Sequence, residues 1–346
     1  MSSLHEYRLE LVFPEHDFIL AIEKNGDYPL NQWLADNQHF VTQAIHKHGG
    51  VLFRGFGLSP DEFVGASAIV SPHPPLPYTA GMSPRPKYSD SLYVSTQRPK
   101  ELEIPLHHEY SYFPFWPMKI FFYCETAPLR GGETSLASTR SFMSRLDPRI
   151  LSAIAARRVR YVRNYAPEFR LSWQQAFESD DRAVVERFCR TNDIQFEWRE
   201  NGQLRTTNIS QGTALHPQTG ESLWHNHIQI FSMYQDQHGR LSPVLAQYAK
   251  SVSPEVMRRV LSLPAEEMPT NAFYGDGAEI EPAVIEEVFA TLERIKVGFP
   301  WVKGDFLALD NMLTFHGRSS FEGPRLILTL LKEQHRTQPA VLPGST

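Results

Sequence analysis

The chain has 346 residues, of which 41% are hydrophobic and 21% charged, and this composition is that of an ordinary globular protein with a large core. A net charge of −5 without any basic run argues against nucleic-acid binding. Residues 1–6 show no basic region that leads into an apolar stretch, and no apolar run approaches the length of a membrane span. We expect a cytoplasmic protein with Cys124 and Cys189 as buried thiols, and the sequence leaves its oligomeric state open.

Predicted helices and strands are interspersed along the whole chain. Apolar periodicity predicts helices over residues 30–48, 141–158, 173–190, 254–263 and 282–295, and Ser59, Pro60 and Glu62 have the pattern of a capping box that begins another. Strand-like runs cover residues 50–56, 119–124, 159–163, 222–231, 304–309 and 325–331. The proline-rich segment 72–86 predicts an ordered loop or lid. No repeat or linker divides the chain, so we expect a single domain of mixed α/β class over residues 1–346.

Two motifs far apart in the chain combine two imidazoles, a carboxylate and a following arginine. The first is the run 105–109, Pro-Leu-His-His-Glu, and the second is the stretch 310–325. His107, Glu109 and His316 would fill one face of an octahedron and leave three positions for a bidentate 2-oxo acid and O₂. Such nitrogen and oxygen ligands suit iron(II), whereas a structural zinc site is closed, tetrahedral and often contains cysteine. The sequence therefore predicts a mononuclear iron(II) site.

The spacing of the first motif carries the geometric argument. On a β-strand, His107 and Glu109 point to the same face, while His108 points away from it. With 14 histidines and 39 acidic residues, chance gives one or two such pairs, and among the 14 only His107 has an acid two positions later. The pair alone is weak evidence. Its context supports the metal site, because an aromatic and apolar run over 112–124, which reads as buried strands, follows the pair. His316 lies further downstream and is itself followed by an arginine.

A second histidine cluster lies at residues 224–227, Trp-His-Asn-His, with His216 upstream. On a strand, His225 and His227 share a face, but they lack a nearby acid or cysteine at ligand spacing, which disfavours a second metal site. Asn226 on the opposite face is the candidate for a hydrogen bond to substrate. A solvated strand explains these polar residues equally well.

Taken together, the motifs resemble the TauD/TfdA family of iron(II)/2-oxoglutarate-dependent oxygenases, and within it the clavaminate synthase-like and SyrP-like branches. The resemblance covers most of the chain and rests on the segments 50–56, 104–112, 127–134, 216–226, 273–277 and 310–325. It implies a double-stranded β-helix (jelly-roll) core with flanking helices. The sequence alone predicts no more than a mixed α/β fold.

Carried over position by position, the resemblance implies roles for five residues. His107, Glu109 and His316 are implied as iron ligands. Arg325 is implied to bind the distal carboxylate of 2-oxoglutarate, and Thr134 to donate a hydrogen bond to the same co-substrate. A bidentate arginine fixes the orientation of a carboxylate, which a lysine would not do.

The distance between His316 and Arg325 departs from the pattern of the best-known family members. It is nine residues, shorter than in taurine dioxygenase or clavaminate synthase, so Arg318 is a competing anchor for 2-oxoglutarate. Arg325 is favoured because it begins the strand-like run 325–331. Arg318 is then a candidate for contacting substrate or supporting a metal ligand, and an exposed loop arginine is an equally good interpretation.

The resemblance also implies a reaction: hydroxylation of an amino acid, or of an aminoacyl group on a carrier protein, in natural-product (antibiotic) biosynthesis. Epoxidation, desaturation and ring closure stay open. Halogenation is disfavoured because Glu109 occupies the position that the family's halogenases free for chloride, and the sequence has no glycine-rich phosphate loop for a nucleotide cofactor. Alternatives of another class are a zinc-dependent hydrolase, which would leave Arg325 and Thr134 without a role, and a non-catalytic binding protein.

Overall fold

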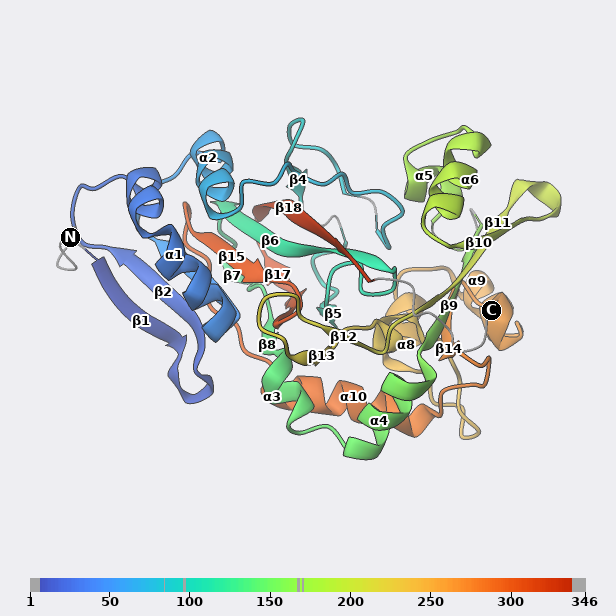
Figure 1. The fold of residues 1–346 in the computed structure, drawn as a ribbon. Helices are drawn as coiled ribbons and strands as arrows, with labels where there is room; N and C mark the ends of the chain where they lie inside the picture. Colours follow the sequence, from blue (N-terminus) through green and yellow to red (C-terminus); the bar gives the residue numbers. More distant parts are fainter. Residues whose placement is uncertain (1–6, 84, 96–97, 167–168, 170, 338–346) are drawn as a thin grey trace, which may run out of the picture.

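The computed structural model describes residues 7–337, apart from 84, 96–97, 167–168 and 170. Its largest sheet has seven strands, and all neighbours are antiparallel except β2 and β3. In spatial order they are β1 (Tyr7–Phe13), β2 (Phe18–Lys24), β3 (Gly50–Arg54), β15 (Phe306–Asp310), β6 (Phe115–Thr126), β18 (Leu326–Arg336) and β4 (Tyr93–Val94). Strands from the two ends of the chain therefore lie side by side in one sheet (Figure 1).

Four smaller sheets accompany it in the described part of the chain. A three-stranded sheet consists of β5 (Ile104–His107), β16 (Thr314–Arg318) and β8 (Leu136–Ser138). A four-stranded sheet consists of β10 (Gln195–Trp198), β11 (Leu204–Ser210), β9 (Val159–Tyr165) and β14 (Thr270–Tyr274). Two pairs are formed by β12 (Thr213–Leu215) with β13 (Ser222–Trp224) and by β7 (Arg130–Gly131) with β17 (Phe321–Glu322).

Both faces of the large sheet are buried at its central strands. Along β6, Ile120 packs into one hydrophobic cluster and the next residue, Phe121, into another, because successive side chains of a strand point to opposite faces. Helices α1 (Leu30–His48) and α2 (Pro60–Val70) contribute to the second cluster and cover that face. The first cluster includes Phe315 of β16, so the three-stranded sheet packs against the other face. The functional motifs therefore lie against this other face of the sheet.

The remaining α-helices are mostly short. They are α3 (Thr139–Met143), α4 (Pro148–Arg157), α5 (Trp173–Phe177), α6 (Arg182–Thr191), α7 (Ile228–Phe231), α8 (Pro243–Ala249), α9 (Pro254–Leu261) and α10 (Pro282–Ile295). In Figure 1, β1, β2 and α1 lie at one end of the molecule, and the four-stranded sheet with α5, α6, α8 and α9 lies at the other. No helix in the described ranges is both long and apolar enough to cross a membrane.

The helix predictions are confirmed where caps and periodicity agree. Helices α1 and α10 have the predicted ends, and α2 begins with the predicted capping box at Ser59. The helix predicted over 141–158 is wrong in its middle, because Asp147 caps a new helix that begins at Pro148. The helix predicted over 173–190 is likewise broken, and Asp181 caps its second part. In both cases an internal capping residue ends the apolar repeat.

Five of the six predicted strands are present as β3, β6, β9, β15 and β18, with ends shifted by a few residues. The sixth, predicted over 222–231, is wrong beyond Trp224: the strand stops there and residues 228–231 form α7. The described residues of segment 72–86 contain neither helix nor strand, as expected for a loop. Both cysteines, Cys124 and Cys189, are buried free thiols, as predicted.

Candidate metal centre and its cavity

Three side chains from distant parts of the chain meet beside the three-stranded sheet. One ligand atom each from His107, Glu109 and His316 lies within 4.8 Å of the others, and among the described residues this is the one such group of three. His107 ends β5 and His316 lies in β16, and the two are direct partners across the strand pair. Gly317 allows this close pairing, because a Cβ there would lie 2.4 Å from the Ile104 carbonyl oxygen. Strand pairing thus brings the two imidazoles together.

Glu109 reaches the site in a different way from the one predicted. Strand β5 ends at His107, so Glu109 lies in a turn and not on a continued strand. The next residue, Tyr110, has a φ of 60°, in the left-handed region that non-glycine residues rarely adopt. The expectation of a shared strand face is therefore wrong in its geometry, although the turn still brings the carboxylate beside the two histidines.

A single side-chain amide holds this turn in place. The Glu109 N–H donates to Asn311 Oδ1 at 2.7 Å, and Asn311 Nδ2 donates to the carbonyl oxygens of Glu109 at 2.9 Å and Pro117 at 2.8 Å. Asn311 is fully buried and lies between strands β15 and β16. The segment that leads to His316 therefore fixes the backbone that carries Glu109.

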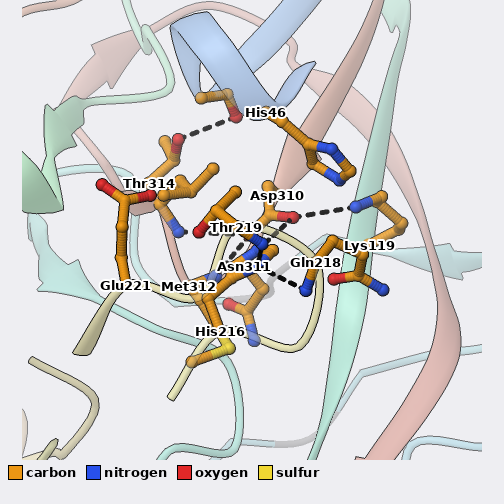
Figure 2. A network of polar contacts seen from close by, with 12 residues as sticks. His46, Lys119, His216, Gln218, Thr219, Glu221, Asp310, Asn311, Met312 and Thr314 are labelled. Atoms are coloured by element: carbon orange, nitrogen blue, oxygen red, sulfur yellow. Dashed lines mark hydrogen bonds and ion pairs between the residues drawn. The ribbon is translucent and has the colours of Figure 1, made fainter. Parts of the chain in front are cut away.

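Next to Asn311, the carboxylate of Asp310 is the centre of a buried polar network (Figure 2). Its Oδ2 accepts from Lys119 Nζ at 2.8 Å and lies 3.1 Å from His216 Nε2, while Oδ1 accepts from the backbone N–H groups of Met312 and Leu313. His216 Nδ1 accepts from two backbone N–H groups, so Nε2 carries the proton that faces Asp310. This network anchors the loop between β15 and β16 under the metal-ligand candidates.

The protonation states of the site suit metal binding. Burial and the neighbouring His316 lower the pKa of His107 to about 3, so its imidazole is neutral at physiological pH. Burial alone would raise the pKa of Glu109, but Arg85 and the two histidines outweigh it and lower that pKa. Arg85 Nη2 lies 2.6 Å from Glu109 Oε2. The trio therefore combines one neutral imidazole, a carboxylate anion and His316.

The free ring nitrogens show that the three residues fit a metal ion. Neither ring nitrogen of His316 has a hydrogen-bond partner, although both are buried. His107 Nδ1 donates to the Pro105 carbonyl oxygen at 2.9 Å, which fixes its tautomer and leaves Nε2 as the ligand atom. Two nitrogens and one carboxylate, with no cysteine, form the donor set of a non-haem iron(II) centre with open positions. Orphaned buried nitrogens of this kind are what a metal ion would satisfy.

The trio opens into a cavity of about 780 Å³, its open side included, and the wall of this cavity also contains Thr134, Arg318 and Arg325. Arg325 donates through Nε to the Gly132 carbonyl oxygen at 2.8 Å, and no carboxylate of the described residues pairs with it. Burial, together with the charge of Arg318, lowers the pKa of Arg325 to about 9. Thr134 Oγ1 accepts a hydrogen bond from Trp301 Nε1 at 3.2 Å. A partly buried arginine that has no counter-ion among the described residues therefore faces the same cavity as the metal-ligand candidates.

Comparison with known proteins identifies the family. The model of the taurine catabolism dioxygenase TauD, TfdA family matches residues 14–331. The dapdiamide synthesis protein DdaC of Enterobacter agglomerans is 31% identical over 329 residues, which are 94% of each chain. The chain belongs to the TauD/TfdA family of dioxygenases.

A further relative and two solved structures are also similar to this TauD/TfdA dioxygenase. A clavaminate synthase-like protein of Arabidopsis thaliana is 25% identical over 312 residues, covering 87% of this chain and 86% of that protein. The fold resembles that of PvcB from Pseudomonas aeruginosa, at 16% identity and a TM-score of 0.51 over 96% of this chain and 93% of that one. It also resembles AAD-2, crystallised with Mn(II) and N-oxalylglycine, at 12% identity and a TM-score of 0.53 over 97% and 99%.

Family membership confirms the predicted enzyme class and cofactors. The chain is a dioxygenase that depends on iron and 2-oxoglutarate and uses O₂, and the clustered His-Glu-His trio offers a place for the metal. The alternatives of a zinc-dependent hydrolase and of a non-catalytic binding protein are thereby set aside.

The sequence left open whether Arg318 is an exposed loop arginine. In the structure of this dioxygenase it is not exposed. It is 3% exposed, and its guanidinium donates to the carbonyl oxygens of Arg98, Pro99 and Leu102 at 3.1, 2.7 and 2.6 Å. Burial lowers the pKa of Arg318 to about 10. Because both of its terminal nitrogens bond to the backbone, Arg318 fastens segment 98–102 to the wall of the cavity.

Asn226, predicted to contact substrate, uses its amide on the backbone. Its Nδ2 donates to the Gly212 carbonyl oxygen at 2.7 Å and its Oδ1 accepts from the Ile228 N–H at 3.3 Å. The described residues that line the cavity include His227 and do not include Asn226. A substrate contact by Asn226 stays a prediction. Its hydrogen bonds to the backbone stabilise the turn that leads into α7.

The other histidines of the two histidine motifs, His108, His225 and His227, are buried and packed. His108 lies away from the trio, as expected, with Nε2 2.9 Å from Thr139 Oγ1 and its ring stacked on Phe315. His225 packs against Trp116, and His227 Nδ1 lies 2.7 Å from Ser111 Oγ. His225 and His227 are not on a strand, so the argument that they share a strand face does not apply.

Several residues of the site were not singled out from the sequence. Arg85 and Trp301 contact the trio or the wall, and Asn311 was noted only as part of a motif. His227, which adjoins His107, was considered only for a second metal site. Arg85 lies in the proline-rich segment that was predicted as an ordered loop or lid. This prediction was the one feature of the sequence that could have placed Arg85 near the site. Nothing in its local pattern distinguishes it from the other arginines of the chain.

Proposed function

We propose that His107, Glu109 and His316 hold the catalytic iron(II) of this dioxygenase. The observation that carries the proposal is the convergence of their ligand atoms within 4.8 Å, in a buried position that opens into a cavity. Two imidazoles and one carboxylate on one side of the metal leave the opposite side for co-substrates. The hydrogen bond from His107 to Pro105 and the clamp of Asn311 on Glu109 support the same assignment, because metal ligands need oriented side chains.

Arg325 and Thr134 are the residues that we propose for binding 2-oxoglutarate. Arg325 is a partly buried cation without a carboxylate partner among the described residues, and it lines the same cavity as the trio. An incoming carboxylate would replace the hydration that burial has removed, and the guanidinium can bind it with two parallel hydrogen bonds. Arg318 is less suited to this role because it already donates to three carbonyl oxygens.

When bound, iron(II) with 2-oxoglutarate and O₂ supplies the oxidising power for attack on a substrate C–H bond, and 2-oxoglutarate leaves as succinate and CO₂. The residues of this chain bind and orient the reactants and keep water out. Tyr112, Phe122 and Ile230 form apolar parts of the cavity wall, which favours a dry site. Arg85 holds one oxygen of Glu109 and thereby limits how this carboxylate can turn.

Hydroxylation of an amino acid, or of an aminoacyl group tethered to a carrier protein, is the reaction that we propose. The support comes from relatives that act in synthetic pathways: DdaC is a dapdiamide synthesis protein, and PvcB is an iron- and 2-oxoglutarate-dependent oxygenase of an isonitrile synthetic pathway. Epoxidation and desaturation begin with the same cofactor chemistry and are the alternatives. The presence of Glu109 argues against halogenation.

The wider expectations belong to the same proposal. We infer that the seven-stranded and the three-stranded sheet, which pack face to face, are the two sides of a jelly-roll core with flanking helices, since PvcB, an iron- and 2-oxoglutarate-dependent oxygenase of solved structure, has a similar fold. We further propose that residues 1–346 form one domain and that the enzyme acts in the cytoplasm.

An anaerobic titration tests the cofactor site. Metal-free protein is titrated with iron(II) and 2-oxoglutarate while the weak visible metal-to-ligand charge-transfer band is recorded. We expect the band in the wild type, its loss in His316→Ala and its weakening in Arg325→Ala. The exposed His39 provides the matched control, because His39→Ala should leave the band unchanged. A folded wild-type protein without the band, or an unchanged band in His316→Ala, would contradict the assignment.

A further inference from the structure

A second cavity lies next to the one that holds the trio. It has about 860 Å³, its open side included, and its wall is formed largely by apolar side chains from the four-stranded sheet, from α8 and from the segments around them. Phe169, Leu171, Met233, Val244 and Tyr248 belong to this wall.

The two cavities share part of their walls. Met82, Ser83, Arg98, Pro105 and Ile230 line both of them. They are therefore separated at most by one layer of side chains, and this layer contains a small serine and an unbranched methionine that adapts its shape to neighbours. A molecule that occupies the metal cavity thus has a neighbouring space into which its far end can extend.

The segment between the cavities is held firmly in place. Arg163 of β9 donates to the carbonyl oxygens of Ala80 at 2.9 Å and Gly81 at 3.0 Å, just before Met82. Ala80 N–H donates in turn to the Ala176 carbonyl oxygen at 2.8 Å. Arg163 is 4% exposed, and it also belongs to the wall of the second cavity. The shared wall is therefore a defined part of the fold, fastened from the four-stranded sheet.

The chemistry of the second cavity differs from that of the first. Its described lining has no carboxylate and no histidine, and aliphatic, aromatic and methionine side chains predominate. Such a wall stabilises apolar groups by removing them from water. It offers nothing for a second metal ion and nothing for an isolated ammonium group. The cavity therefore suits the apolar part of a ligand.

We propose that the second cavity binds the apolar remote part of an elongated substrate whose reacting end lies beside the trio. This inference rests on the proposed function and makes its substrate class more specific: an amino acid joined to an acyl chain or to a comparable arm, and not a compact free amino acid. A compact amino acid next to 2-oxoglutarate would use the metal cavity alone and leave the second one without a role. Free and carrier-tethered substrates share this elongated form.

A series of N-acyl-L-alanines of increasing chain length, from acetyl to octanoyl, tests the proposal. Each is titrated anaerobically into wild-type protein loaded with iron(II) and 2-oxoglutarate, and both the calorimetric Kd and the charge-transfer band are recorded. We expect affinity to rise about fourfold for each buried methylene until the cavity is filled. We also expect the bound compound to shift the band, because one molecule reaches from the second cavity to the metal.

Variants of Val244 locate the effect. In Val244→Phe, the rise in affinity with acyl length should stop at a shorter chain than in the wild type. In Val244→Ala, the rise should continue to a longer chain. The half-exposed surface residue Val184 on α6 provides the matched control, and Val184→Phe should behave like the wild type. These changes leave the trio, Arg325 and Thr134 untouched.

The outcomes separate this inference from the function on which it rests. If no charge-transfer band appears, the proposed cofactor site itself is contradicted. With the band present, the inference is overturned if affinity does not depend on chain length, if none of the compounds binds, or if binding leaves the band unshifted. It is also overturned if Val244→Phe and Val184→Phe show the same chain-length dependence. A carrier-tethered substrate is distinguished by comparing an N-acyl compound with the same group as a pantetheine thioester.

Discussion

At the scale of single residues, the position of Glu109 depends on its neighbours more than on its own side chain. Its backbone is bonded on both sides by Asn311, and the following Tyr110 is held in a left-handed conformation. A conformation of this kind costs about 1–3 kcal/mol and persists because the surroundings impose it. Asn311 is thus a positioning residue for the carboxylate.

Asn311→Ala should weaken iron(II) binding by about 10–100-fold, because the turn that carries Glu109 loses its support. The measurement is the iron(II) Kd from the charge-transfer titration, alongside the free energy of unfolding. Asn271→Ala is the matched control, since Asn271 is also buried and donates to two carbonyl oxygens but lies away from the trio. An equal loss of iron affinity in both variants would show that Asn311 acts through general stability alone.

The two candidate anchors for 2-oxoglutarate can be separated by a pair of lysine variants. Arg325→Lys keeps a charge but loses the paired hydrogen bonds, so we expect 2-oxoglutarate affinity to fall about tenfold or more while iron binding persists. Arg318→Lys should instead lower stability, because the three carbonyl oxygens of segment 98–102 lose their donors. The Kd of 2-oxoglutarate and thermal unfolding are measured for both. The reverse pattern would make Arg318 the anchor.

At the scale of elements, strands β6 and β15 are joined inside the core by the ion pair of Lys119 and Asp310. Both side chains are almost completely buried, so removal of one partner leaves an uncompensated charge. Burial would raise the pKa of Asp310, but Lys119 and His216 outweigh this effect and lower it. The loop that carries Asn311 therefore depends on a charge pair within the sheet.

Lys119→Met should lower the free energy of unfolding by about 3–5 kcal/mol, the usual cost of breaking a buried pair from one side. The double variant Lys119→Met/Asp310→Asn should recover part of this loss, because no bare charge remains. Urea unfolding of the wild type, the single variant and the double variant measures the coupling. A double variant that is less stable than the single one would mean that Asp310 matters through its bonds to Met312 and Leu313 instead.

The elements also show where sequence patterns are informative. Helix α2 was predictable because Ser59, Pro60 and Glu62 form a local capping pattern that the structure keeps. The helix predicted over 141–158 failed because apolar periodicity does not register a cap in its middle, here Asp147. The end of β5 at His107 depends on contacts with Asn311, some two hundred residues away, and no local pattern records such contacts.

The candidate site was predictable to a similar degree. The trio followed from residue types and spacing, and the structure brings these residues together, although through a turn and not along a strand. The role of Arg85 could not be predicted, because it depends on a contact with Glu109 that only the folded chain forms. The hydrogen bonds of Asn226 to backbone groups could not be predicted either, because they depend on the turn that replaces the expected strand.

At the scale of the whole molecule, the site joins parts of the chain that are distant in sequence, so ligands should stabilise the entire fold. With iron(II) and 2-oxoglutarate each at 100 times its Kd, the expected gain is about 2.7 kcal/mol for each ligand, which raises the thermal midpoint by several degrees. Thermal unfolding with and without these ligands measures the shift, with Mn(II) as a redox-stable substitute for iron. Glu109→Ala should lose the metal-dependent part, and an undiminished shift there would place the metal elsewhere.

The position of β18 has a consequence for how the protein is made. This strand is the last described element of the chain, yet it lies between β6 and β4 inside the large sheet, and Arg325 directly precedes it. During synthesis, the chain would emerge with β6 lacking a neighbour on one side, and this exposed edge would need protection from other chains. A product truncated before Arg325 lacks both the strand and the arginine, so the edge of β6 stays without its neighbour and the proposed anchor for 2-oxoglutarate is missing. The proposed role of Arg325 therefore predicts that such copies do not consume 2-oxoglutarate.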